Sequence, residues 1–166
     1  SPLYGIHSHL KMMTMKKLEF KTEIAAKRDK VWRTMFGPKT YREWVNVSWP
    51  NADFEGKWEK GENIRFTSAG NGGTMANIVE CKPYDYLLAK HVAVINKDRS
   101  LDTESDIAKG WIGTTESYTF TEKNGKTELK VEMKAPEAWI KMFEDGWPNA
   151  LKELKRLSEK QEVESH

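Results

Sequence analysis

Cysteine is nearly absent from this sequence, which has one, Cys81, in 166 residues. A lone thiol cannot form an intrachain disulfide, and this is compatible with the reducing cytoplasm. The N-terminus also lacks a charged segment followed by an apolar stretch and a small-residue cleavage site, the pattern of a secretory signal. We therefore expect a cytoplasmic location.

Long apolar runs and a strong charge of either sign are missing too. No apolar run approaches the roughly 20 residues that a membrane-spanning helix needs. The net charge of +2 is too small to favour electrostatic binding of nucleic acid. These values predict neither a membrane span nor a nucleic-acid partner.

Patterns that would hold a metal or a nucleotide are incomplete. His7 and His9 form an HxH pair, but no cysteine or acidic residue lies near them. The acidic segment 102–106 resembles the start of a calcium loop, yet Gly113 stands where the loop needs a glutamate. The glycine-rich stretch 68–74 lacks the spacing of a phosphate loop. We predict no metal and no cofactor.

Tryptophan, by contrast, is abundant. So many bulky rings can fill an ordinary core, or they can line a pocket that receives flat or apolar guests. The seven tryptophans are Trp32, Trp44, Trp49, Trp58, Trp111, Trp139 and Trp147.

The length predicts one α+β domain over residues 15–162, preceded by a leader or expression remnant at 1–14. Alternating apolar residues indicate strands, and apolar spacings of three and four indicate helices. The expected strands are 16–25, 63–68, 74–81, 84–95, 111–122 and 127–133. The expected helices are 27–44, with a break at Gly37-Pro38, and 136–160. The polar segment 96–109 is expected to be a mobile loop.

The last predicted helix carries Gly146 and Pro148 in its middle. Its apolar stripe keeps its spacing across both residues, which predicts one bent helix instead of two. A proline inside a helix costs about 3 kcal/mol. Burial of Trp147 would offset most of this, because a large apolar side chain contributes about 1.5–3 kcal/mol. Trp147 should face the sheet and Pro148 the solvent.

Three stretches resemble a known family. They are AAKRDKVWRTMFGPKTYREW (25–44), YTFTEKNGKTELKVEM (118–133) and GWPNALKELKRL (146–157). In this order they are similar to the START-like, or SRPBCC, superfamily, and within it to the C-terminal domain of the activator of the heat-shock-protein-90 ATPase. The likeness covers about residues 16–160 and departs from the family pattern at 61–64 and 96–109.

The resemblance implies a helix-grip fold. In it a curved antiparallel sheet of six or seven strands surrounds a long C-terminal helix, and two short helices follow the first strand. It also implies a cavity between sheet and helix, which many superfamily members use for lipids, hormones, polyketides or other apolar molecules. The candidate ligand-binding residues are Trp44, Trp49, Phe66, His91, Trp111, Tyr118, Trp139, Phe143 and Trp147.

His91 is the most informative polar candidate. It shares a strand face with apolar residues, where it could bond a ligand, exchange a proton, or simply be satisfied within the core. Glu116, on the face of Tyr118, is the only obvious second polar group. Cys81 has no identifiable base, so a nucleophilic triad has no support. We assign no catalytic residue.

Three hypotheses remain. The first is a protein that binds a small hydrophobic or aromatic ligand in a cavity. The second is a protein-interaction module related to chaperone cofactors, with a chaperone or another protein as partner. The third is a cyclase- or hydrolase-type enzyme that acts on an apolar substrate. The protein is expected to be a monomer or a homodimer.

Overall fold

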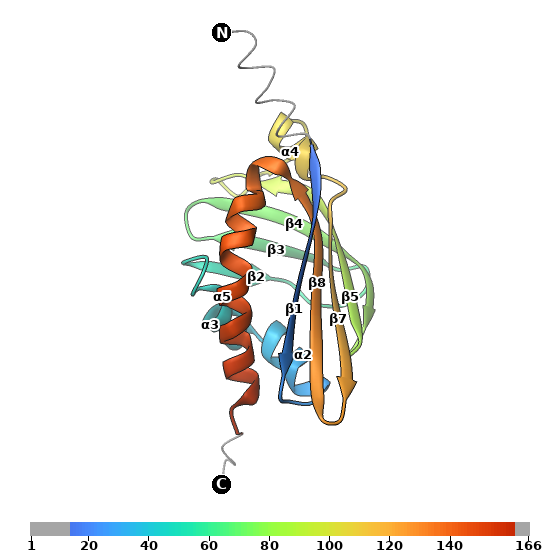
Figure 1. The fold of residues 1–166 in the computed structure, drawn as a ribbon. Helices are drawn as coiled ribbons and strands as arrows, with labels where there is room; N and C mark the ends of the chain where they lie inside the picture. Colours follow the sequence, from blue (N-terminus) through green and yellow to red (C-terminus); the bar gives the residue numbers. More distant parts are fainter. Residues whose placement is uncertain (1–13, 162–166) are drawn as a thin grey trace.

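The computed structural model describes residues 14–161, which form a curved antiparallel sheet with a long helix along its inner face (Figure 1). The strands are β1 (Met15–Ile24), β2 (Ala52–Glu55), β3 (Asn63–Ser68), β4 (Gly72–Lys82), β5 (Tyr86–Ile95), β6 (Leu101–Asp102), β7 (Thr115–Lys123) and β8 (Lys126–Pro136). The helices are α2 (Arg28–Phe36), α3 (Pro38–Val45), α4 (Asp106–Trp111) and α5 (Ile140–Glu159), with a 3₁₀ turn, Glu137–Trp139, before α5.

The strands pair in the order β1-β8-β7-β5-β4-β3-β2, and β6 adds a short pair to β5. Figure 1 shows β3 and β4 running across the strands β1, β8 and β7, so that the sheet curls around α5. The register between β4 and β5 shifts at two places, and such bulges bend a sheet. This confirms the helix-grip fold, with α2 and α3 as the two short helices after the first strand.

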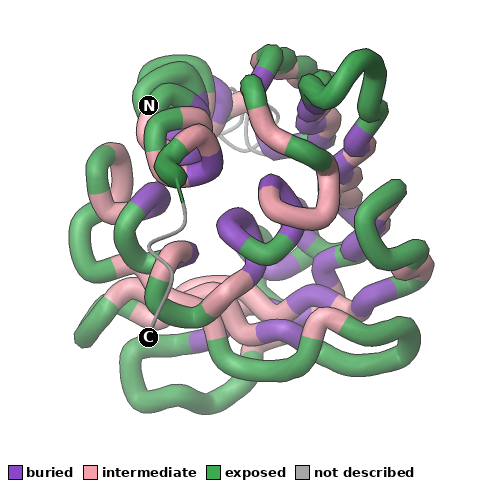
Figure 2. Tube along the Cα trace, turned by 90° about the horizontal axis from the view of Figure 1, so that it is seen from below, coloured by how far each residue is buried: buried purple, intermediate pink, exposed green. Residues whose placement is uncertain are grey.

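The core lies between the sheet, α2, α3 and α5. Figure 2 shows buried residues on the inward sides of these elements and exposed residues on the outer turns. In β8 the alternation is regular: Leu129, Val131 and Met133 are buried, whereas their neighbours are more exposed. This is the period of two that predicted the strand. The Asn124-Gly125 turn before β8 has positive φ at both residues, which fits the predicted hairpin.

Helix α5 runs without a break through Gly146 and Pro148, which confirms a single helix. Trp147 is buried and Pro148 is exposed, also as predicted. The close packing of a neighbouring side chain explains why position 146 is a glycine. A methyl group on Gly146 would lie 2.6 Å from Cζ2 of Trp49, so only a glycine lets that ring rest against the helix backbone. The Ser48 hydroxyl also donates to the Gly146 carbonyl at 2.5 Å.

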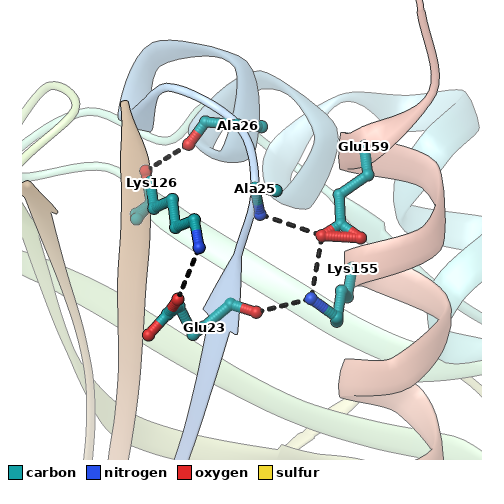
Figure 3. A network of polar contacts seen from close by, with 7 residues as sticks. Glu23, Ala25, Ala26, Lys126, Lys155 and Glu159 are labelled. Atoms are coloured by element: carbon teal, nitrogen blue, oxygen red, sulfur yellow. Dashed lines mark hydrogen bonds and ion pairs between the residues drawn. The ribbon is translucent and has the colours of Figure 1, made fainter. Parts of the chain in front are cut away.

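The C-terminal end of α5 is tied to the end of β1 by polar contacts (Figure 3). Lys155 Nζ donates to the Glu23 carbonyl at 2.7 Å and to Glu159 at 2.8 Å. The Glu159 carboxylate also accepts the Ala25 N–H at 2.9 Å. These contacts position the helix along the sheet at one end.

Three expectations about the elements are wrong in detail. The segment 96–109, expected to be a loop, contains β6 and the start of α4; the Asp102 carboxylate accepts two backbone N–H groups there, and Ser105 caps α4. Trp111 ends α4, and the strand expected from 111 begins at Thr115. Pro136 ends β8 instead of opening the final helix, because its neighbours still pair with β1.

None of the helices among residues 14–161 is long and apolar enough to cross a membrane. The predicted leader and the pair formed by His7 and His9 lie outside the described residues, apart from Thr14.

Candidate functional site

A cavity of about 180 Å³ lies between the inner face of the sheet and α5. It exceeds the roughly 150 Å³ of an apolar protein cavity that can bind benzene. It is smaller than the roughly 300–1,000 Å³ typical of pockets for drug-sized ligands. The volume therefore suits a molecule of one or two rings.

The cavity wall is mainly aromatic and contains most of the side chains that the sequence pointed to. Those that line it are Trp44, Trp49, Phe66, His91, Trp111, Tyr118, Phe143 and Trp147. Trp139 does not line this cavity. It borders an adjoining groove of about 390 Å³ that shares Phe66, Trp111 and Phe143 with the cavity wall. The groove lies beside α4 and the first turn of α5, where it gives the cavity a mouth.

Sequence reasoning missed other lining residues. They are Met35, Phe36, Tyr41, Val45, Ala52, Trp58, Thr74, Met133 and Met142, together with Glu116, which was noted only as a possible polar neighbour. Met35 and Phe36 fall at helical spacing within 27–44, which indicates an inward face but does not distinguish core from cavity. Trp58 follows β2 in a segment without periodicity, so no pattern placed it.

Trp147 lies at the centre of the aromatic wall. Its ring centroid is 5.5 Å from that of Trp49, 5.7 Å from that of Trp44 and 6.1 Å from that of Phe20. Trp44 is only 2% exposed, and its indole N–H donates to the Met35 carbonyl at 3.0 Å. It forms part of the deep wall because α3 packs against α5.

Trp111 covers His91 from α4. Their ring centroids are 5.3 Å apart, and Trp111 also packs edge-on against Phe143 at 6.1 Å. The backbone at His91 holds this arrangement, since its N–H donates to the Thr114 carbonyl and its carbonyl accepts the Gly113 N–H. The short helix therefore closes one side of the cavity over the histidine.

His91, Glu116 and Tyr118 form a connected polar group in the cavity wall. His91 Nε2 lies 2.9 Å from Glu116 Oε1, and the Tyr118 hydroxyl donates to Glu116 Oε2 at 2.5 Å. The histidine side chain is 2% exposed and that of the glutamate 13%. The two donors thus occupy both oxygens of a nearly buried carboxylate.

Electrostatic effects in this group oppose one another. Burial acts to raise the pKa of Glu116, but the hydrogen bond and charge of His91, with the Tyr118 hydroxyl, outweigh it and hold the pKa below its ordinary value. Burial raises the pKa of Tyr118 well above the usual range, and the charge of Glu116 adds to this. Burial also raises the pKa of Tyr41, and the charge of Glu116 makes a smaller contribution in the same direction. The carboxylate is therefore the anion of the group, and the tyrosines stay neutral donors.

Replacement of Glu116 by glutamine should lower the free energy of unfolding at neutral pH by about 1 kcal/mol, because the amide keeps an acceptor for only one of the two donors. A carboxyl whose pKa is lower in the folded protein stabilises above its unfolded pKa, roughly 4.3, and this contribution is lost as the pH falls towards the folded value. The difference between wild type and Glu116→Gln should therefore shrink below about pH 4. Urea titrations at several pH values measure it, and a difference that grows on acidification would contradict the assignment.

These features define a class of protein: a helix-grip domain whose mainly aromatic cavity contains a buried polar group. Within that class, the model of the Activator of Hsp90 ATPase homolog 1-like protein family matches residues 25–159, and the chain belongs to this family. No curated protein matches the chain.

Solved structures share the fold at low sequence identity. MLL2253 from Mesorhizobium loti superposes with a TM-score of 0.67 at 15% identity, covering 89% of this chain and 100% of its own. CalU16 from Micromonospora echinospora has a TM-score of 0.59 at 18% identity, covering 87% and 76%. DynU16, from the dynemicin biosynthetic locus, has a TM-score of 0.62 at 16% identity, covering 84% of this chain and 46% of its own. At such identities the likeness shows the fold alone.

Proposed function

We propose that the protein binds a small, flat, hydrophobic or aromatic molecule in the cavity between its sheet and α5. The observation that carries this proposal is the cavity itself, because its wall is built mainly from aromatic and other apolar side chains and contains a buried polar group. A core that served stability alone would be close-packed, with few voids larger than a water molecule. The adjoining groove supplies a route for entry.

A second candidate function is catalysis of the cyclase or hydrolase type on an apolar substrate. It is favoured by the 2.9 Å contact between His91 and Glu116, since a histidine oriented by a carboxylate can take up a proton. Hydrolysis of a naphthyl ester by wild type and His91→Gln tests it. Turnover that falls to background in the variant would support an enzyme, and equal rates would argue against one.

The cellular location and the oligomeric state are also proposals. The free thiol of Cys81 supports a location in the reducing cytoplasm. Burial raises the pKa of this thiol, and the negative charge of Glu59 adds a smaller increase. Because the thiol stays protonated, it is a poor nucleophile. Size-exclusion chromatography with light scattering would decide between monomer and homodimer.

The binding proposal predicts that Phe143→Ala weakens the binding of an aromatic ligand. Phe143 lines both the cavity and its mouth, and it packs edge-on against Trp49 at 6.4 Å and Trp111 at 6.1 Å. Loss of such an aromatic contact should cost about 1–2 kcal/mol of binding, or roughly 5- to 30-fold in Kd. Native mass spectrometry of freshly purified protein identifies any co-purified molecule, and quenching of tryptophan fluorescence by 2-methylnaphthalene gives the affinity.

Leu157→Ala is the matched control. Leu157 lies on the same helix, is half-buried against the core, and does not line the cavity. Its variant should bind with wild-type affinity even where its stability is lower. Equal affinities of wild type and Phe143→Ala would remove the residue from the site, and no binding of any aromatic probe would end the proposal.

A further inference from the structure

Three buried polar atoms that belong to side chains of the cavity wall have no hydrogen-bond partner among residues 14–161. They are the indole nitrogens of Trp58 and Trp147 and Nδ1 of His91. Trp147 is 4% exposed and His91 2% exposed. A buried polar group without a partner is costly, and the large majority of buried side-chain polar atoms in native proteins have one. Three such atoms around one cavity therefore point to the chemistry of its guest.

Each of these atoms is limited in whether it can donate or accept a hydrogen bond. An indole N–H donates and cannot accept, so Trp58 and Trp147 call for an oxygen or another acceptor. Nε2 of His91 is held by Glu116, which leaves Nδ1 as the ring nitrogen for a guest. Nδ1 accepts a hydrogen bond when the imidazole is neutral and donates one when the imidazole carries a second proton.

A hydroxyl group on an aromatic ring fits His91 in both states. As a neutral phenol it donates to Nδ1, and as a phenolate it accepts from the protonated ring. Its oxygen can also accept an indole N–H. A carboxylate is disfavoured, because the neighbouring Glu116 is itself ionised and already accepts two donors. An ammonium is disfavoured because neither indole can accept from it.

We propose that the cavity selects phenolic or enolic molecules of one or two rings, whose hydroxyl group pairs with Nδ1 of His91. This inference rests on the proposed binding function and adds the group that the ligand must carry. Glu116 and Tyr118 act as positioning residues: the carboxylate, fixed by the tyrosine hydroxyl, holds Nε2 and so leaves Nδ1 for the hydroxyl of the guest.

Three probes of similar size separate the contribution of the hydroxyl hydrogen to affinity from those of the oxygen atom and of the apolar rings. 2-Naphthol carries the hydroxyl, 2-methoxynaphthalene keeps the oxygen without its hydrogen, and 2-methylnaphthalene has no oxygen. The hydroxyl makes naphthol the most easily hydrated of the three, so burial alone would rank it last. We expect wild type to bind 2-naphthol at least about fivefold more tightly than either other probe, because a buried polar group gains its missing partner.

Calorimetry on His91→Leu provides the second arm. A leucine side chain is apolar and offers no hydrogen-bonding group in place of Nδ1, so this variant should lose the preference for naphthol while it still binds 2-methylnaphthalene. The comparison of probes on wild type stands alone where the variant does not fold.

The outcomes distinguish the two proposals. Equal affinities of wild type for all three probes would overturn the role of His91 and leave the binding function intact. If the methoxy compound matches naphthol and both exceed the methyl compound, the indole groups select the ligand and the inference about His91 is wrong. Absence of binding by all three overturns both proposals.

Discussion

Trp147→Ala should lower the free energy of unfolding by about 3–5 kcal/mol, the range for removal of a large aromatic side chain from a core. The ring is 4% exposed and lies within 6.3 Å, centroid to centroid, of four aromatic neighbours: Phe20, Trp44, Trp49 and Tyr118. These neighbouring rings come from three separate parts of the chain. Loss of the Trp147 ring should therefore loosen the contact of α5 with both the sheet and α3. Urea unfolding followed by circular dichroism measures the change.

Two further variants make this test specific. Trp147→Phe keeps an aromatic ring and removes an indole N–H that has no partner among the described residues, so it should recover most of the lost stability. Lys152→Ala, at an exposed position of the same helix, should change stability by no more than about 0.5 kcal/mol. A loss below about 1 kcal/mol in Trp147→Ala would show that the ring is not central to the core.

Gly146→Ala should destabilise the protein by about 1–3 kcal/mol, although alanine normally favours a helix over glycine by about 1 kcal/mol. The sign reverses because the added methyl would lie 2.6 Å from the ring of Trp49, which is itself held by Phe143 and Trp147. Since Trp49 lines the cavity, affinity for 2-methylnaphthalene should fall with stability.

A double variant isolates the cause. In a Trp49→Leu background the large ring is gone, so Gly146→Ala should become neutral or stabilising there. Thermal unfolding of the two single variants and the double variant gives the coupling energy between these sites. If alanine destabilises equally with and without Trp49, the glycine is required for some reason other than the close approach of the ring.

These residues also show what the sequence could and could not predict. The apolar stripe of α5 and the alternation of β8 are local patterns with fixed periods, so they predicted the elements and the burial of Trp147. The reason for Gly146 could not be predicted, because Trp49 lies 97 positions earlier and reaches the helix only through the packing of α3.

The same limit applies to the polar group. The sequence placed Glu116 on the face of Tyr118 but gave no convincing partner for His91. Their contact depends on the register of β5 against β7, in which Ala89 faces Glu116, and on α4 between the two strands. Helix α4 itself has only six residues, and its polar capping residues read as a loop.

The sheet order has a consequence for how copies of this chain can meet. Strand β1 is an outer strand, with one side of its backbone paired to β8. Its sequence, MKKLEFKTEI, places lysine or glutamate at half of its ten positions. Charged side chains on an outer strand discourage the growth of one sheet onto another, and the opposite border, β2, is only four residues long. Self-association through a continuous intermolecular sheet is therefore disfavoured at both borders.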